Sequence, residues 1–487
     1  MQRLLISSLS LVAFGASAYA QSAPTAPDPA APADPAAAPV VEPARAPVAE
    51  PTPAAPLEPA PAAPAAPAKP DEKPAITGKW ETSLYGFVEV DSIYDSTQGL
   101  NDLAGNAAIP KSGTYTGDHG QTTMAARNSR IGFRLNAPTY NSIKASAQLE
   151  MDFLGNQPPG ISEASFFQNA QFRYRHLNLK LETPVVDILI GQSWQLFGWQ
   201  GLFHPNTIDI QGVPAQVYSR APQIRFSKKV KAGDFSVELA LAALRPVQRA
   251  SGVPDGQVGI KLNYDKLKAY HTGGGSGTSL DSAAIGVSAI GRRFAVNEFA
   301  ATSTKDVTAN GYGISVDALI PLVPATKEKK ENALTVIGNF VTGAGIADEY
   351  TGLSGGVRQP TLPAPVGGGA APVYTPNVDN GLVEFRADGT LHAVQWTSFM
   401  VGVQYYLPPS GKAWLSANYS HLSSDNAHAF GPAAAVWDKS DWAEGNLFVD
   451  VTPAVRLGLG FSYSNQKFVD GSDATNYRTQ LSGFLIF

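Results

Sequence analysis

Six basic side chains between positions 130 and 225 are the residues best suited to bind a ligand. They are Arg130, Arg134, Lys144, Arg173, Arg175 and Arg225. The arginines alternate with apolar neighbours, as in Phe172-Arg173-Tyr174. A guanidinium group stays charged and presents a fork of N–H donors that fits carboxylates and phosphates. Along the wall of a narrow passage, such a ladder of bases predicts attraction of small anions.

Two acidic residues fall on the same face of the pattern as these bases. Glu150 and Asp152 are therefore expected to pair some of the arginines. The alternative interpretation is that all of these charges only keep a water-filled passage wet, without selecting one sign of ion. The sequence leaves both interpretations open.

A second candidate region is the segment from Trp194 to Arg220. It is too apolar for an exposed surface loop and too often broken by Gly and Pro for a strand. Its candidate functional residues are Trp194, Phe197, Trp199, His204, Asp209 and Arg220. We expect a loop that folds back and constricts the passage, with its aromatic rings on the wall and His204 and Asp209 near the opening. The alternative is a loop that packs on a neighbouring subunit.

The elements that must position these residues are strands with two different faces. In the segment Ile143–Phe153, apolar residues alternate without exception with Lys144, Ser146, Gln148, Glu150 and Asp152. A period of two places the apolar set on one face and the polar set on the other. A mid-strand change of this parity at His176 predicts a β-bulge.

The last segment of the chain favours a membrane barrel over a soluble sandwich. Leu481, Gly483, Leu485 and Phe487 share one face, and the ending on Phe487 resembles the assembly signal of outer-membrane barrels. An arginine on the lipid face would cost roughly 2 to 4 kcal/mol at the bilayer midplane. The apolar faces are therefore expected to meet lipid, and the arginines to meet the lumen.

About 16 strands, uncertain by two, can be counted, and the connections between them alternate in length. The short turns are Thr183-Pro184, residues 407–411 and Thr452-Pro453, and the long loops are residues 97–121, 343–390 and 422–439. Short turns at one end and long loops at the other are typical of transmembrane barrels. The fold class predicted is all-β, a transmembrane antiparallel β-barrel preceded by a signal peptide and an Ala/Pro-rich segment.

Three parts of the chain differ in composition. Residues 1–20 have the Arg3, apolar stretch and Ala-Tyr-Ala ending of a signal peptide. Residues 21–75 are mostly Ala and Pro, which predicts a disordered or polyproline II periplasmic linker. This linker either contacts peptidoglycan or is a spacer without a partner. Residues 76–487 form the predicted barrel domain.

Composition excludes several classes of protein. There is no cysteine, so disulfides and thiolate metal sites are absent. Residues 76–487 carry 32 basic and 34 acidic side chains, which gives no basic excess for nucleic acid. No Walker pattern occurs, and the seven histidines show no metal-ligand spacing. We therefore expect no enzyme activity, no metal and no cofactor.

Four runs of residues resemble one family, the DcaP-like porins. The runs are Ser129-Arg130-Ile131-Gly132-Phe133, Leu149-Glu150-Met151-Asp152-Phe153, Ile190-Gly191-Gln192-Ser193-Trp194 and Arg220-Ala221-Pro222-Gln223-Ile224-Arg225-Phe226. The resemblance covers residues 83–230, and the last third only through general barrel features. It implies a homotrimer in the bacterial outer membrane, a constricting third loop at residues 194–219, and passage of small, often anionic, organic solutes. The Ala/Pro tract departs from the coiled coil that family members can carry.

Three hypotheses follow for the whole chain. The first is an outer-membrane porin, surrounded by lipid, for passive diffusion of small hydrophilic solutes, favouring anions such as carboxylates. The second is a structural outer-membrane barrel that anchors a periplasmic tether to the cell wall. The third is a soluble secreted β-protein.

Overall fold

The computed structural model describes residues 79–487, apart from 101, 156–170, 210–212, 247–250, 273–277, 352, 354–358, 387 and 431–436. The predicted signal peptide (1–20) and Ala/Pro-rich linker (21–75) lie outside the described residues. No helix in the described part of the chain is long and apolar enough to cross a membrane.

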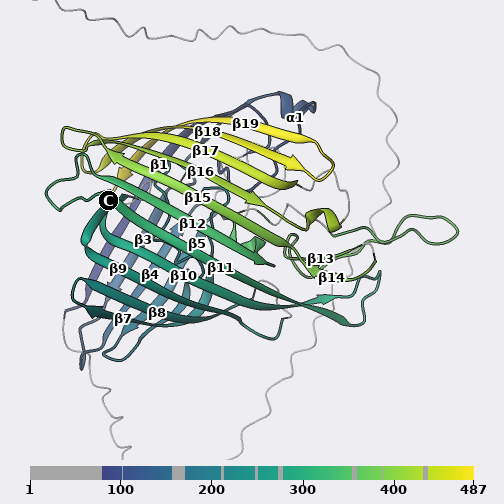
Figure 1. Cartoon of the computed structure of the whole chain (residues 1–487), viewed down its shortest axis with the longest axis horizontal. Helices are drawn as coiled ribbons and strands as arrows, with labels where there is room; N and C mark the ends of the chain where they lie inside the picture. The colour runs from purple at the N-terminus through teal and green to yellow at the C-terminus, as the bar shows by residue number, and fades with distance from the viewer. Residues whose placement is uncertain are drawn as a thin grey trace, which may run out of the picture. The chain divides into compact units, whose positions relative to one another are not determined.

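One closed antiparallel sheet accounts for most of the described chain (Figure 1). Its strands are β1 (Glu81–Asp95), β2 (Gln121–Ala125), β3 (Arg130–Asn136), β4 (Lys144–Asp152), β5 (Arg173–Glu182), β6 (Asp187–Trp194), β7 (Arg220–Ala232), β8 (Phe235–Leu244), β9 (Asp255–Thr272), β10 (Thr278–Asn297), β11 (Asp306–Val323), β12 (Leu334–Ala344), β15 (Gln395–Tyr406), β16 (Ala413–Ser423), β17 (Trp437–Asp450), β18 (Val455–Phe468) and β19 (Asp473–Ile486). Both β2 and β3 pair with β1, at different heights, so they are two halves of one strand. The barrel therefore has 16 strands, which confirms the predicted fold class.

The barrel closes between its first and last strands. Val88 lies opposite Leu485, and the main chains of Gly86 and Phe487 exchange two hydrogen bonds of 2.9 and 3.0 Å. Gly86 has a φ of +155°, and a Cβ there would lie 2.2 Å from the Arg130 carbonyl oxygen. Only glycine fits this position, which lies beside β3 on one edge of β1 and next to the start of the pairing with β19 on the other edge.

Each strand separates an apolar outer face from an inner face, as the period of two predicts. On β18, Leu457, Leu459 and Phe461 are about half exposed, whereas the intervening residues are buried inside the barrel. No other part of the described chain covers this band of exposed apolar residues, so the barrel requires lipid around it. The soluble interpretation is therefore wrong.

The predicted bulge occurs in β5. Glu150 of β4 pairs with His176, whereas the next residue, Met151, pairs with Tyr174. Arg175 is the extra residue, and both Arg175 and His176 point to the inside of the barrel. The confirmed bulge thus places two polar side chains in succession on the inner face.

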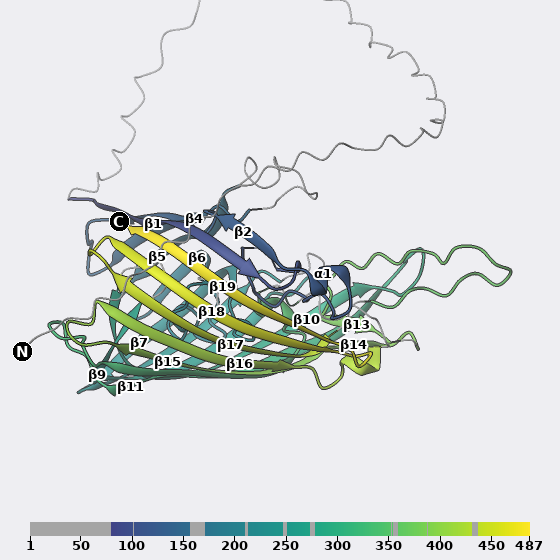
Figure 2. The same ribbon diagram turned by 90° about the horizontal axis from the view of Figure 1, so that it is seen from above.

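Long connections gather at one end of the barrel, and the C-terminus lies at the other (Figures 1 and 2). The loop end holds α1 (Tyr115–Asp118), the turns η2 (Ala347–Glu349) and η4 (Ala427–Phe430), and a small hairpin of β13 (Val383–Phe385) and β14 (Leu391–Ala393). The turns predicted at residues 183–184, 407–411 and 452–453 connect strands at the opposite end. This end is expected to face the periplasm.

Candidate functional site

The described residues of the segment between β6 and β7, 195–209 and 213–219, lie inside the barrel. We call this segment, residues 195–219, the inner loop. Its Leu196, Phe197 and Phe203 side chains are at most 1% exposed. The main-chain N–H groups of Leu196 and Phe197 both donate to the Gln257 side chain on β9, at 2.9 Å.

Farther along, the inner loop reaches the opposite wall. The Ser416 and Ser420 hydroxyls of β16 donate to the carbonyl oxygens of Asn206 and Pro214. The loop is therefore fixed to strands on two sides of the lumen and crosses it.

Inward-facing glycines make room for the inner loop on the wall. A Cβ at Gly286 on β10 would lie 2.6 Å from the Trp199 ring, and one at Gly313 on β11 would lie 2.9 Å from the Phe197 ring. On β18, a Cβ at Gly460 would lie 2.5 Å from Ile208. Because no real Cβ approaches a neighbour so closely, these positions require glycine while the loop keeps its place.

The inner loop is also joined to the long loop after β12. The Tyr218 N–H donates to the Glu349 carbonyl oxygen at 2.7 Å, and the Ser219 hydroxyl donates to the Glu349 carboxyl. Burial raises the pKa of Glu349, which favours the protonated, uncharged form of this carboxyl at the contact between the two loops.

Three of the predicted arginines share the two predicted carboxylates. The Arg175 guanidinium lies 2.7 Å from Glu150 and 3.1 Å from Asp152. Arg173 lies 2.6 Å from Asp152, and Arg130 lies 3.5 Å from Glu150. We call these five residues the arginine–carboxylate cluster. It has one more positive than negative charge.

Aromatic rings flank this cluster at the two ends of the inner loop. The Trp194 ring centroid lies 4.7 Å from that of Tyr218 and 5.3 Å from that of His204. The Arg220 guanidinium lies over the Trp194 ring, 4.6 Å from its centroid. Among the described residues Arg220 forms no ion pair, and its Nη1 atom is buried without a hydrogen-bond partner.

The other three predicted bases do not join the cluster. Arg225 donates to the Gln223 side chain at 3.0 Å and to the Trp194 carbonyl oxygen, and no carboxylate of the described residues pairs with it. Arg134 lies over the Tyr85 ring at 4.4 Å, and Arg134 and Lys144 are both exposed. The six bases therefore form one paired group of three and three separate charges.

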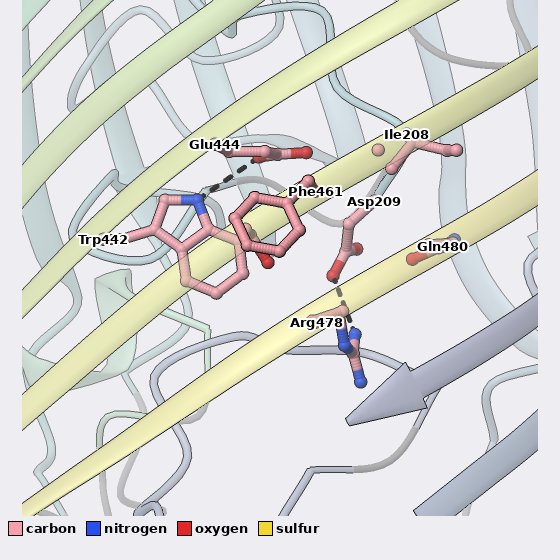
Figure 3. Close-up of a pocket in the computed structure, with 9 residues that line it drawn as sticks. Ile208, Asp209, Trp442, Glu444, Phe461, Arg478 and Gln480 are labelled. Atoms are coloured by element: carbon pink, nitrogen blue, oxygen red, sulfur yellow. Dashed lines mark hydrogen bonds and ion pairs between the residues drawn. The ribbon is translucent and has the colours of Figure 1, made fainter. Parts of the chain in front are cut away.

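Asp209 lies against the wall formed by β17, β18 and β19 (Figure 3). Its carboxylate is 3.8 Å from Arg478 and accepts the Ala104 N–H at 3.0 Å. Beside it, the Trp442 indole donates to Glu444 at 3.2 Å. The cavity between these side chains has a volume of about 10 Å³, which holds at most a single water molecule. A solute therefore does not fit between Asp209 and this wall.

Exposure separates the two signs of charge on the inner face. Eight carboxylates on the barrel strands are at most 6% exposed: Glu89, Asp91, Asp95, Glu150, Asp152, Asp255, Asp317 and Glu444. By contrast, 34% of the Arg173 side chain and 12% of the Arg130 side chain are exposed. Glu238 is 25% exposed but forms a 2.9 Å ion pair with Lys261. Arg175, Arg292, Arg456 and Arg478 are buried like the carboxylates, so within the arginine–carboxylate cluster the accessible charges are those of Arg173 and, to a smaller extent, Arg130.

Several inward charges were not predicted from the sequence. They are Glu89, Asp91, Lys261, Arg292, Arg456 and Arg478. The same alternation marks them, since Arg478 stands between the outward residues Tyr477 and Thr479. Among the described residues, no group of three or more His, Asp or Glu is placed to hold a metal ion.

Removing the Glu150 carboxylate is expected to destabilise the barrel, because Arg130 and Arg175 would lose a buried partner. We expect Glu150→Gln to lower the free energy of unfolding by about 3 kcal/mol. Glu182→Gln is the matched control, since Glu182 pairs with Lys180 at the surface and should contribute less than about 1 kcal/mol. The temperature at which the folded band disappears from a denaturing gel measures both, and equal temperatures would contradict the prediction.

Solved structures share the fold. The outer-membrane channel DcaP of Acinetobacter baumannii aligns with a TM-score of 0.59 and 18% sequence identity, over 84% of this chain and 97% of the channel. An anion-selective porin from Comamonas acidovorans aligns with a TM-score of 0.45 and 11% identity, over 84% of this chain and 100% of the porin. No protein-family model matches the chain, and no curated protein sequence matches it.

Proposed function

We propose that this chain is an outer-membrane porin that passes small hydrophilic solutes by diffusion and favours anions such as carboxylates. The observation that carries the proposal is the difference in exposure on the inner face. Most strand carboxylates are buried there, whereas 34% of the Arg173 side chain and 12% of the Arg130 side chain are exposed. A solute in the lumen then meets more positive than negative charge.

The range of this effect depends on the salt concentration. An accessible guanidinium attracts anions over about 10 Å at 0.1 M salt and about 3 Å at 1 M salt. Low-dielectric walls strengthen the attraction in a narrow lumen. The proposed anion preference is therefore a low-salt property, and it weakens as the salt concentration rises.

We assign the constriction to the inner loop and the lumen surface to the charged residues of β3, β4, β5 and β7. In this assignment, three aromatic residues fix the loop to the wall: Trp194, Phe197 and Trp199. Arg220 provides a positive charge at the end of the loop. His204 joins two parts of the inner loop through its contact with the Val217 carbonyl oxygen, and Asp209 accepts the Ala104 N–H from the first long loop. Phe487 serves in assembly, at the seam that closes the barrel.

A homotrimer is supported by the unequal strand lengths around the barrel. Strands β3 to β6 have 7 to 10 residues, whereas β9, β10 and β11 have 18, 20 and 18. A strand needs about 9 to 11 residues to cross the hydrocarbon layer at a tilt of about 45°. The wall of short strands is therefore the one we expect to pack against other copies of the chain.

Planar-bilayer recording of the purified protein tests the proposal. We expect stepwise conductance and, in a salt gradient, a reversal potential on the anion side. A protein that inserts but remains silent would exclude the porin. Deleting residues 21–75 should leave the conductance unchanged; loss of envelope integrity with unchanged conductance in that variant would favour the tether function instead.

A further inference from the structure

A charged cavity outside the arginine–carboxylate cluster lies at the loop end of the lumen. It has a volume of about 230 Å³ and opens to solvent. Its walls come from the end of the inner loop, the start of β7, the end of β8, and η2. The charged residues that line it are Arg220, Arg245, Arg292, Asp255 and Asp348.

Both carboxylates of this cavity are already occupied by one arginine. The Arg292 guanidinium lies 2.7 Å from Asp255 and donates to Asp348 at 2.9 Å. It also donates to the Gly345 carbonyl oxygen at 3.0 Å. Arg292 and its two carboxylates form a rigid, buried group, which leaves Arg220 and Arg245 as the uncompensated charges.

Arg220 and Arg245 have no counter-ion among the described residues. The Arg220 guanidinium lies against two neighbouring rings, 4.6 Å from the centroid of Trp194 and 5.3 Å from that of Tyr218. Arg245 is exposed, its main-chain N–H donates to the Pro222 carbonyl oxygen at 2.9 Å, and its guanidinium makes no ion pair among the described residues. Two guanidinium groups that line one cavity without a carboxylate partner are suited to share an anion.

The uncharged wall of the cavity is mostly apolar. Ala221, Pro222, Leu244 and Pro246 line it, together with the polar residues Gln195 and Ser219. A free inorganic anion would gain nothing from the apolar side chains, whereas a short carbon chain would bury apolar surface against them. A single water molecule needs about 10 to 15 Å³ of such space, so the cavity has room for a small organic molecule.

We propose that this cavity is an outer binding subsite for a small organic carboxylate with an apolar carbon chain. The carboxylate bridges Arg220 and Arg245, and the chain lies on Pro222, Leu244 and Pro246. The subsite rests on the proposed porin function, because it would load solute at the loop end before the constriction. It adds one specificity-determining residue, Arg245, which lies outside the inner loop.

Hexanoate binding to the full-length protein in detergent, measured by calorimetry, tests this subsite. We expect hexanoate to bind, hexanamide not to bind, and inorganic phosphate to bind more weakly than hexanoate. Arg245→Gln should weaken hexanoate binding about tenfold, which corresponds to about 1.4 kcal/mol. Arg220→Lys should weaken it as well, because an ammonium group lacks the forked geometry.

The matched control is Arg293→Gln, since Arg293 is an exposed arginine on the outer face of β10. This variant should bind hexanoate as the native protein does. Equal hexanoate affinity of Arg245→Gln and the native protein, or equal affinity for hexanoate and hexanamide, would overturn the subsite. Because calorimetry does not depend on conductance, a silent channel that binds hexanoate would refute the porin and not the subsite.

Discussion

Replacing Arg130, Arg173 and Arg225 together by glutamine should move the reversal potential in a salt gradient toward cation preference. The arginine–carboxylate cluster would then keep Glu150 and Asp152 opposite Arg175 alone, so its net charge would change from +1 to −1. Arg225, which has no carboxylate partner in the described residues, would be lost in addition. Anions would no longer be concentrated by this wall, and the change should be large at 0.1 M salt and small at 1 M salt.

A second triple variant separates this effect from a change of total charge. Lys305, Lys439 and Lys467 are exposed and lie on a loop or on the outer face of the barrel. Their replacement by glutamine removes the same charge without altering the lumen, and the reversal potential should stay at the native value. If the arginine variant also keeps the native value at low salt while remaining folded, these arginines do not set selectivity.

The strands could be predicted because each one carries its own signal. Alternation between lipid and lumen is local, so the inward set of β4 is visible in the residues of β4 alone. The break between β2 and β3 was not predicted, since it depends on a long-range contact. Ser129 in this gap exchanges hydrogen bonds with the Glu89 main chain, and no pattern in the neighbouring residues predicts this contact.

The candidate site was only partly predictable, because ion pairs depend on the register between strands. The parity change at His176 indicated the bulge, but it could not show that Arg175 would reach both Glu150 and Asp152. The pair between Asp209 and Arg478 joins the inner loop to the last strand, so only the closed barrel brings it together. Side-chain type was therefore predictable at the site, whereas pairing was not.

The inward glycines were the least predictable part. In sequence, Gly286 resembles any glycine that weakens a strand. In the structure it lies under Trp199, whose indole donates to the Val287 carbonyl oxygen at 3.1 Å, and the Gly198 N–H donates to Ser288 at 2.8 Å. These glycines make room for rings of the inner loop. Because those rings belong to a distant part of the chain, the residues next to each glycine could not indicate this role.

Gly286→Leu is therefore expected to displace the inner loop and increase the single-channel conductance. The new Cβ would lie 2.6 Å from the Trp199 ring and 3.2 Å from the Phe203 ring, and the rest of the leucine has no room. Overpacking of this kind costs about 1 to 3 kcal/mol. Since the barrel wall is held by its own ladder of hydrogen bonds, the loop should move rather than the strand.

The control for this variant lies on the same strand with the opposite orientation. Gly291 faces outward, and a Cβ there would have nothing within 4 Å, so Gly291→Leu should leave the inner loop in place. Planar-bilayer recording should give a larger or noisier conductance for Gly286→Leu and a native conductance for Gly291→Leu. A native conductance in both variants would mean that the inner loop does not limit the passage, because its displacement would then leave the narrowest point unchanged.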